Sequence, residues 1–241
     1  VEQGTCFYIA GEGHNGFGLL GGIVSFENCS NFGGRRIIKG EQIWVKTKIK
    51  FPLGFEFNQN GLNKFMRLRT FHDEEGRDVS EGYNDLYLNA DPSFEPWKPY
   101  APFKYIFEGA QQWFSVGVGE NFFQMGKWET IEYSIRLDDK VAAEGGNALV
   151  RVWLNGRLLG ETQNRRTLNT PESWVSSLYF FTYWDNAGAH KNQKFWIDDL
   201  VITTDTPTKR DALGNPFIGV DSNDSSAPSH PNQVTVTILP Q

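Results

Sequence analysis

Two arginines with a single residue between them are the first feature of this sequence that could do chemistry. They lie in the segment from Lys64 to Phe71 (KFMRLRTF), where apolar and polar residues alternate. Successive side chains of a β-strand point to opposite faces of a sheet. The alternation therefore predicts one face with Phe65, Arg67, Arg69 and Phe71, and an opposite face with Lys64, Met66, Leu68 and Thr70. A face with two guanidinium groups could bind carboxylates in a bidentate manner.

Tyrosines recur with the same period on two other segments. In YNDLYLN the face opposite Asn84, Leu86 and Leu88 would carry Tyr83, Asp85, Tyr87 and Asn89. In LYFFTYWD one face would carry Tyr179, Phe181, Tyr183 and Asp185, and the other Leu178, Phe180, Thr182 and Trp184. Tyrosine rings can stack on sugars while their hydroxyl groups exchange protons. Together with the arginines, these faces favour a surface that binds an acidic polysaccharide. A solvated or salt-bridged strand face with buried aromatic residues is the alternative.

The elements that must position these side chains have the pattern of β-strands throughout. Alternating segments cover residues 40–51, 64–71, 83–89, 103–108, 128–137, 148–155, 177–184 and 194–203, separated by clusters of Gly, Asn, Asp and Pro. The Asn155-Gly156 pair predicts a two-residue hairpin that places its flanking strands antiparallel and adjacent. Eight or more strands without a convincing helix predict an antiparallel β-sandwich and exclude a Rossmann fold.

The composition suits a single all-β domain. The chain has 241 residues, of which 39% are hydrophobic and 22% charged, so it can bury a sizeable core. There are 23 basic and 29 acidic residues, and the net charge of −6 disfavours nucleic acid as a partner. We expect the domain to span residues 1–219, with residues 220–241 as a tail or a late strand.

The sequence also bears on where the protein acts. No apolar run approaches the roughly 20 residues that span a bilayer, and Val1 opens into polar sequence without a signal-peptide pattern. We expect a monomeric, trimmed mature protein without a membrane span, secreted or periplasmic. Cys6 and Cys29 could then form a disulfide or remain free thiols. The four histidines have no zinc-ligand spacing, so we expect no transition metal, and we expect no organic cofactor.

Several stretches resemble a known family. The order of segments resembles that of jelly-roll polysaccharide lyases that cleave alginate or glucuronan. The segments that carry this resemblance are EQIWVKTKIKFPLGFEF, NKFMRLRTF and EGYNDLYLN. Two later segments resemble the closing strands of concanavalin A-like polysaccharide-degrading domains. They are LYFFTYWDN and KFWIDDLVITTDTPTKRDALGNPFIG. The resemblance covers residues 40–219 and implies an antiparallel β-jelly-roll sandwich. A different lyase subgroup has a Gln-x-His strand, and the absence of this strand disfavours that subgroup. Tyr83 and Tyr87 stand four apart where the alginate lyases have a Tyr-x-Tyr-type strand.

The resemblance implies β-elimination at a uronate. A base removes the proton α to the carboxylate, an acid protonates the leaving glycosidic oxygen, and cations neutralise the carboxylate. Arg67 and Arg69 would hold the carboxylate, and Lys50, just before an FPLG turn, would lower a tyrosine pKa. Tyr183 or Tyr87 would serve as base and acid, and His72 is an alternative base. The expected substrate-binding residues are Tyr83, Asp85, Asn89 and Tyr179.

The paired aspartates in WIDDLVI suggest a metal site. Alternation would place Phe195, Ile197, Asp199 and Val201 on one face and Trp196, Asp198, Leu200 and Ile202 on the other, so one aspartate would face apolar neighbours. Similar jelly-roll carbohydrate domains often hold a structural Ca²⁺ in this position, bound also by N-terminal oxygens. The expected calcium ligands are Asp198 or Asp199 with Glu12 or Glu27. A buried salt bridge or strand-end hydrogen bonding is the alternative.

The leading hypothesis is a secreted lyase that cleaves an acidic polysaccharide of the alginate or glucuronan class. A fold of this kind also suits a non-catalytic, lectin-like carbohydrate-binding module, and the fold alone does not separate the two. The absence of a Glu-x-Asp-x-Glu strand disfavours a glycoside hydrolase of the concanavalin A-like type. An adhesion or structural domain would need an exposed apolar patch.

Overall fold

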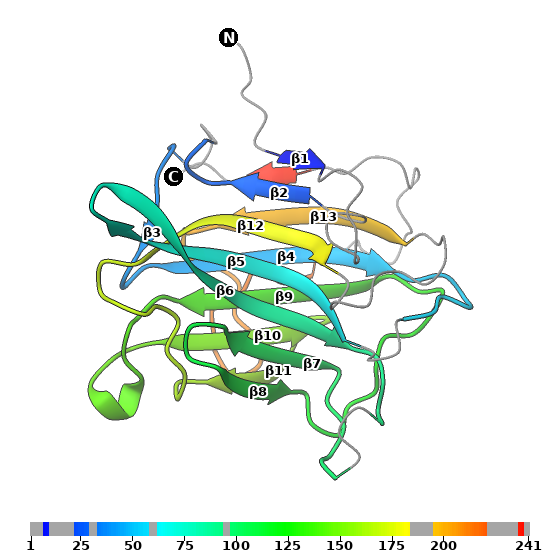
Figure 1. Cartoon of the computed structure of the whole chain (residues 1–241). Coiled ribbons are helices and arrows are strands. Elements are labelled where there is room, and N and C mark those ends of the chain that lie inside the picture. Colours follow the sequence, from blue (N-terminus) through cyan, green and yellow to red (C-terminus); the bar gives the residue numbers. More distant parts are fainter. Residues whose placement is uncertain are drawn as a thin grey trace.

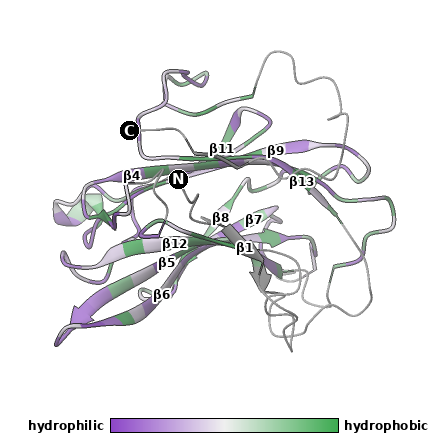
Figure 2. Cartoon of the chain, turned by 90° about the horizontal axis from the view of Figure 1, so that it is seen from above, coloured by the Kyte–Doolittle hydropathy of each residue, from purple (hydrophilic) through white to green (hydrophobic). Residues whose placement is uncertain are grey.

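Two β-sheets pack face to face. A computed structural model of the chain describes residues 7–9, 22–28, 33–57, 62–93, 97–183, 195–220 and 236–238. The larger sheet has the strand order β1 (Phe7–Ile9), β2 (Gly22–Ser25), β12 (Trp174–Tyr183), β5 (Leu62–Glu74), β6 (Arg77–Asn89), β7 (Phe103–Phe107) and β8 (Gln112–Val116), and β3 (Ile37–Ile38) also pairs with β12. The smaller sheet has the order β11 (Arg157–Thr162), β10 (Leu149–Leu154), β9 (Glu129–Arg136), β4 (Gln42–Lys50), β13 (Trp196–Thr203) and β14 (Val236–Ile238). Figure 1 labels most of these strands, and Figure 2 shows the two sheets as separate layers.

Every strand pair is antiparallel except β13 with β14, which is parallel. Among the described residues, the one short helix is a 3₁₀ turn, η3 (Ala142–Glu144). The predicted antiparallel β-sandwich is therefore confirmed. No helix within the described residues is long and apolar enough to cross a membrane.

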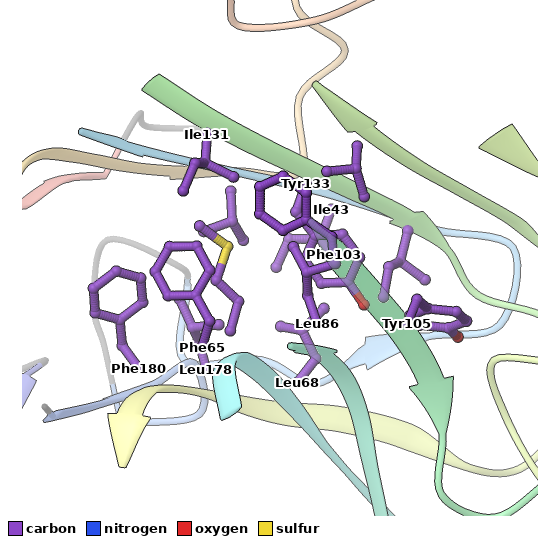
Figure 3. Packing of buried hydrophobic residues seen from close by; sticks show 14 of the residues in the cluster. Ile43, Phe65, Leu68, Leu86, Phe103, Tyr105, Ile131, Tyr133, Leu178 and Phe180 are labelled. Carbon is purple, nitrogen blue, oxygen red and sulfur yellow. The ribbon is translucent and has the colours of Figure 1, made fainter. Parts of the chain in front are cut away.

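The core lies between the sheets, because every second side chain of a strand points toward the opposite sheet. Phe65, Leu68 and Leu86 from the larger sheet face Ile131 and Tyr133 from the smaller one, and all are fully buried (Figure 3). Full burial of one such side chain is worth about 1.5–3 kcal/mol relative to exposure. Sandwich packing therefore determines which face of each strand points outward.

The predicted hairpin at Asn155-Gly156 is confirmed. Both residues have positive φ, 52° and 79°, as a two-residue turn between twisted strands requires. Strands β10 and β11 pair on either side of it, with Leu154 opposite Arg157. The turn thereby sets the register at this edge of the smaller sheet.

Three irregularities overturn parts of the predicted face assignments. In β5, Lys64 pairs with Tyr87 and Met66 with Leu86, which leaves Phe65 as an extra, bulged residue. Phe65 and Met66 are both buried in the core. Lys64 therefore lies on the outer face, with Arg67 and Arg69, because a β-bulge shifts the alternation by one position.

The other two irregularities lie in β12 and β13. Phe181 has φ of 50° beside a register shift and packs in the core, so it does not share the face of Tyr179. Asp199 also has φ of 50° and lies at a register shift. Leu200, which follows it, is part of the core, and Ile197, which precedes it, also packs against the core. A simple period of two fails at both positions for the same geometric reason.

The outer face of the smaller sheet is covered by the segment that follows β13. We call residues 204–220 the strap. Trp44 donates a hydrogen bond from Nε1 to the Pro216 carbonyl at 3.2 Å, and Trp153 donates one to Asp211 at 2.9 Å. Phe217 stacks on Trp153 with ring centroids 6.1 Å apart. Of the two outer faces, the one on the larger sheet is therefore left for the charged residues named above.

Glu132 anchors the end of the strap. Its carboxylate accepts hydrogen bonds from the Ile218 and Gly219 N–H groups at 2.7 and 2.9 Å. Burial raises the pKa of Glu132 to about 7, although these hydrogen bonds and the Lys46 and Lys209 charges oppose the rise. A buried carboxyl with a raised pKa makes stability depend on pH.

We expect the free energy of unfolding to fall as the pH rises from about 5 to about 7.5. Burial also raises the pKa of Asp85, to about 6. Glu132 and Asp85 therefore bind protons more tightly in the folded state than in the unfolded one, and folding is penalised as they ionise. At Asp138 and Asp211, burial would raise the pKa, but hydrogen bonds outweigh it and lower the pKa of both carboxyls. Their contribution to the pH dependence of stability therefore lies at more acidic pH.

Urea unfolding at several pH values checks this, and Glu132→Gln should remove most of the slope. Each unit of pKa shift corresponds to about 1.4 kcal/mol. The control Glu120→Gln should keep the slope, because the exposed Glu120 pairs with Arg157 and its pKa is lowered rather than raised. A wild-type free energy that increases over the same pH range would contradict the prediction.

Candidate active site on the outer face of the larger sheet

Four charged side chains meet on strands β5, β6 and the turn after β7. Arg67 donates a hydrogen bond from Nε to Asp85 at 2.7 Å, and its Nη2 lies 3.4 Å from Glu108. Lys64 Nζ lies 3.0 Å from Glu108 and 3.5 Å from Asp85. Asp85 has an exposed fraction of 0% and Arg67 of 4%. We call these four residues the ionic cluster.

The charges of the ionic cluster compensate one another. Burial raises the pKa of Asp85 to about 6, and the Arg67 and Lys64 charges limit the rise. Burial is outweighed at Glu108 by Lys64 and Arg67, which hold its pKa below the usual value. Asp85 likewise outweighs burial at Arg67 and raises the pKa of the guanidinium. At neutral pH two cations therefore face two carboxylates, and Arg67 is already committed to a partner.

Gly82 makes room for this arrangement. Its φ is 102°, and a Cβ added there would lie 2.9 Å from both Cβ and Oε2 of Glu108. The Glu108 side chain thus lies against the bare backbone of β6. The Glu108 amide also donates to the Tyr83 carbonyl at 2.9 Å, which holds the turn after β7 beside that strand.

Arg69 has different surroundings. Its Nη1 donates a hydrogen bond to Tyr179 Oη at 2.8 Å, and its Nε lies 3.5 Å from Ser80 Oγ. No carboxylate among the described residues forms an ion pair with it. The rings of Tyr83 and Tyr179 meet edge to face, with centroids 5.3 Å apart. A cation and two phenol groups are therefore within reach of one ligand.

Tyr83 also contacts the ionic cluster. The Arg67 guanidinium carbon lies 3.7 Å from the centroid of the Tyr83 ring, within the range of a cation–π interaction. Burial raises the pKa of Tyr83, although the Arg67 and Arg69 charges oppose this. The phenol is therefore protonated at neutral pH and can donate its proton.

Further along the face, the exposed indole ring of Trp113 offers a stacking surface. Trp113 on β8 is 47% exposed, and its ring lies 5.3 Å from that of Tyr87, which is itself buried. Lys64 Nζ lies 5.6 Å from the Tyr87 centroid. Indole and phenol rings of this kind can stack on sugars. Sequence reasoning missed Trp113, Glu108 and Lys64, because a regular alternation places Lys64 on the face opposite the arginines.

The structure brings together Arg67, Arg69, Tyr83, Asp85, Tyr87 and Tyr179 of the predicted site residues. Lys50 belongs to β4 of the other sheet, where its Nζ lies 5.7 Å from the Trp196 centroid. His72 Nδ1 lies 3.1 Å from Glu81 near the tip of the β5–β6 hairpin, which reaches beyond the sandwich in Figure 2. Lys50 and His72 thus lie outside the group, because strand connectivity carries them to another sheet and to the hairpin tip.

Asn89 and Tyr183 complete the predicted set. Asn89 donates a hydrogen bond from Nδ2 to the Ala101 carbonyl at 2.7 Å, so it holds the connection between β6 and β7. The backbone of Tyr183 pairs with Lys64 in β12, next to the ionic cluster. The side chain of Tyr183 lies outside the described residues, and its catalytic role stays a prediction.

The expected calcium ligands have other partners in the described part of the chain. Asp199 Oδ2 lies 2.6 Å from Lys48 Nζ, and Glu27 accepts a hydrogen bond from Arg36 at 2.9 Å. Asp198 Oδ1 accepts from the Asp199 N–H group at 2.8 Å. The described residues hold no group of three or more His, Cys, Asp or Glu suited to a metal ion. Glu12, Cys6 and Cys29 lie outside the described residues, so the calcium site and the disulfide stay predictions.

Comparison with solved structures agrees with this architecture. The marine PL-14 alginate lyase from Aplysia kurodai is similar over 83% of this chain and 81% of its own, with a TM-score of 0.51 and 17% identity. An endo-β-1,4-glucuronan lyase from Trichoderma reesei covers 83% of this chain and 79% of its own, with a TM-score of 0.45 and 12% identity. No protein-family model and no curated protein sequence matches the chain. The match to the Aplysia kurodai enzyme supports the jelly-roll sandwich that the sequence resemblance implied, and it concerns the fold alone.

We expect Gly82→Ala to destabilise the protein more than Gly76→Ala. Both glycines have positive φ, 102° and 79°, but a Cβ at Gly76 would meet nothing within 4 Å. Backbone strain at such a position costs on the order of 1–3 kcal/mol. At Gly82 the displacement of Glu108 should add roughly 1 kcal/mol or more through its lost ionic contacts. Equal losses in urea unfolding would show that Glu108 does not depend on Gly82.

Proposed function

We propose that the protein is a polysaccharide lyase that cleaves a uronate-containing polysaccharide by β-elimination. The observation that supports this best is the hydrogen bond from Arg69 to Tyr179, whose ring forms a T-shaped pair with that of Tyr83. β-Elimination at a uronate needs a cation for the carboxylate and proton-transferring groups beside it. Arg69 and the two tyrosines supply these groups in one place, on an outer face that the strap does not cover.

Each group has a role in the proposed reaction. Arg69 binds the uronate carboxylate and stabilises the negative charge that builds up as the α proton leaves. The Tyr179 oxygen, held by Arg69, removes that proton as the base. The bond between the ring carbon and the glycosidic oxygen breaks, a carbon–carbon double bond forms, and Tyr83 protonates the leaving oxygen. Tyr179 takes up this proton in its phenolate form, and the proton then passes from Tyr179 to Tyr83, whose ring it contacts, so that both groups return to their starting states. The net change moves one proton from carbon to oxygen and needs no water or oxidant.

Arg67 has a supporting role in this proposal. Its pairing with Asp85 and its contact with the Tyr83 ring make it a positioning residue rather than the group that binds the carboxylate. The proposal includes action outside the cytoplasm, as a secreted or periplasmic protein, because acidic polysaccharides are extracellular polymers. Alginate and glucuronan, which the names of the structural neighbours mention, are the first polymers to test.

A non-catalytic carbohydrate-binding module is the second candidate. The exposed Trp113 beside Tyr87 favours it, because planar aromatic rings are what such a module needs to hold sugar. The two candidates differ in one observable product. Elimination creates an unsaturated uronate that absorbs near 235 nm, whereas binding leaves the polymer intact.

We expect absorbance near 235 nm to increase when the protein is incubated with at least one uronate polymer. Arg69→Ala should lower kcat/KM by roughly 100-fold or more, because it removes the charge that stabilises the developing anion. Tyr83→Phe and Tyr179→Phe should each lower kcat by on the order of 10²–10⁴, and Tyr183→Phe tests the remaining tyrosine.

Arg157→Ala is the matched control, since Arg157 is an exposed arginine on the smaller sheet, paired with Glu120. It should retain full activity, and thermal unfolding should show that all variants are folded. Retardation of a polymer in an affinity gel without any unsaturated product would refute the lyase and support the binding module. Full activity of Arg69→Ala would refute the assigned site.

A further inference from the structure

Charge is distributed unevenly along the outer face of the larger sheet. Arg69 contacts a phenol and a serine hydroxyl, and within the described residues it has no carboxylate partner. The ionic cluster beside it holds two carboxylates against two cations. Arg36, which lies beyond Arg69 over the Trp174 ring, is paired with Glu27 and Asp78. Only at Arg69, among these positions, is a guanidinium left for an external anion.

Arg69 and the ionic cluster are close enough to contact adjacent rings of one polysaccharide chain. Arg67 and Arg69 share a face two residues apart on β5, which is a separation of about 7 Å along the strand. Asp85 is directly opposite Arg67, and Tyr83 directly opposite Arg69. A polysaccharide with one ring at Arg69 would therefore place an adjacent ring over or beside the ionic cluster.

The ionic cluster is poorly suited to a second carboxylate. The Glu108 side chain is 27% exposed, whereas Asp85 beneath it is fully buried, so the carboxylate that the cluster presents to a ligand is Glu108. Its pKa is lowered because Lys64 and Arg67 outweigh burial, so it carries its charge at neutral pH. Lys104, the other basic residue on this part of the face, is only 4% exposed. A neutral sugar can instead exchange hydroxyl hydrogen bonds with Lys64 and Glu108 and stack on Trp113.

We infer that the preferred substrate alternates uronate residues with neutral sugars, with the uronate carboxylate bound at Arg69 and a neutral sugar bound at the ionic cluster. This inference rests on the proposed function and narrows its substrate class. A homopolymer of uronate has a carboxylate on every ring. When one ring is bound at Arg69, the carboxylate of the adjacent ring lies near the negatively charged Glu108 and is repelled by it. Glu108 is thus the specificity-determining residue, and it is placed there by Gly82 and Lys64.

The test compares oligosaccharides of matched length from the two polymer classes. One class has the repeating disaccharide of a uronate and a neutral hexose or N-acetylhexosamine, and the other comprises polymannuronate, polyguluronate and β-1,4-glucuronan. Initial rates at 235 nm give kcat/KM for each. We expect at least a tenfold preference for one alternating polymer over every homopolymer. A homopolymer cleaved as well or better would overturn the inference and leave the proposed lyase function intact.

Variants of Glu108 make the test specific. Glu108→Gln keeps the shape of the side chain, removes its negative charge and leaves Lys64 less neutralised. It should reduce the preference for the alternating polymer by roughly tenfold, chiefly through a lower KM for homopolymers. Glu120→Gln, an exposed glutamate paired with Arg157, is the control and should leave the preference unchanged. An unchanged preference in Glu108→Gln, with the fold intact by thermal unfolding, would overturn the inference.

Failure of the proposed function gives a distinct result, since no polymer of either class would then produce an unsaturated product. Affinity electrophoresis of the same oligosaccharides with wild type and Glu108→Gln then tests the charge argument alone. Tighter retention of the alternating polymer, lost in Glu108→Gln, would support the specificity assigned to Glu108. Tighter retention of homopolymers by the wild type would overturn it.

Discussion

Two sheets that share one core leave two outer faces, and each of these faces must satisfy its own polar groups. On the smaller sheet this is done by the strap, whose backbone bonds to Glu132 and whose Phe217 stacks on Trp153. On the larger sheet, within the described residues, it is done by side chains such as those of the ionic cluster and the Arg69–Tyr179 pair. This asymmetry is the reason for placing the proposed site on the larger sheet, because the strap covers the outer face of the smaller one.

The ionic cluster shows what such a solution requires. A carboxylate that is as buried as Asp85 destabilises the folded state unless it is paired and hydrogen-bonded. Arg67 and Lys64 supply the pairing, yet the pKa of Asp85 still rises to about 6 because burial outweighs them. These bonds occupy the Arg67 guanidinium, which is why we assign the proposed carboxylate-binding role to Arg69, whose partner is the Tyr179 hydroxyl.

β-Bulges decide which residues reach this face. The bulge at Phe65 turns Lys64 outward, next to Glu108, and the irregularity at Phe181 sends that ring into the core. Bulges of this kind are frequent beside functional sites, where they re-aim a side chain. The composition of the outer face therefore depends on a few positions at which the strand departs from regular alternation.

Much of the architecture could be predicted from the sequence. Alternation, the Asn155-Gly156 turn and the segment order were local signals, and they were sufficient for an antiparallel sandwich, for its resemblance to jelly-roll lyases and for the outward placement of Arg67, Arg69, Tyr83 and Asp85. Only the tertiary structure could show that Lys50 is on the other sheet, that Arg67 is neutralised and that Glu108 joins the site. Periodicity reports the direction of a side chain along one strand, whereas ion pairing, bulges and sheet membership depend on which distant strands become neighbours.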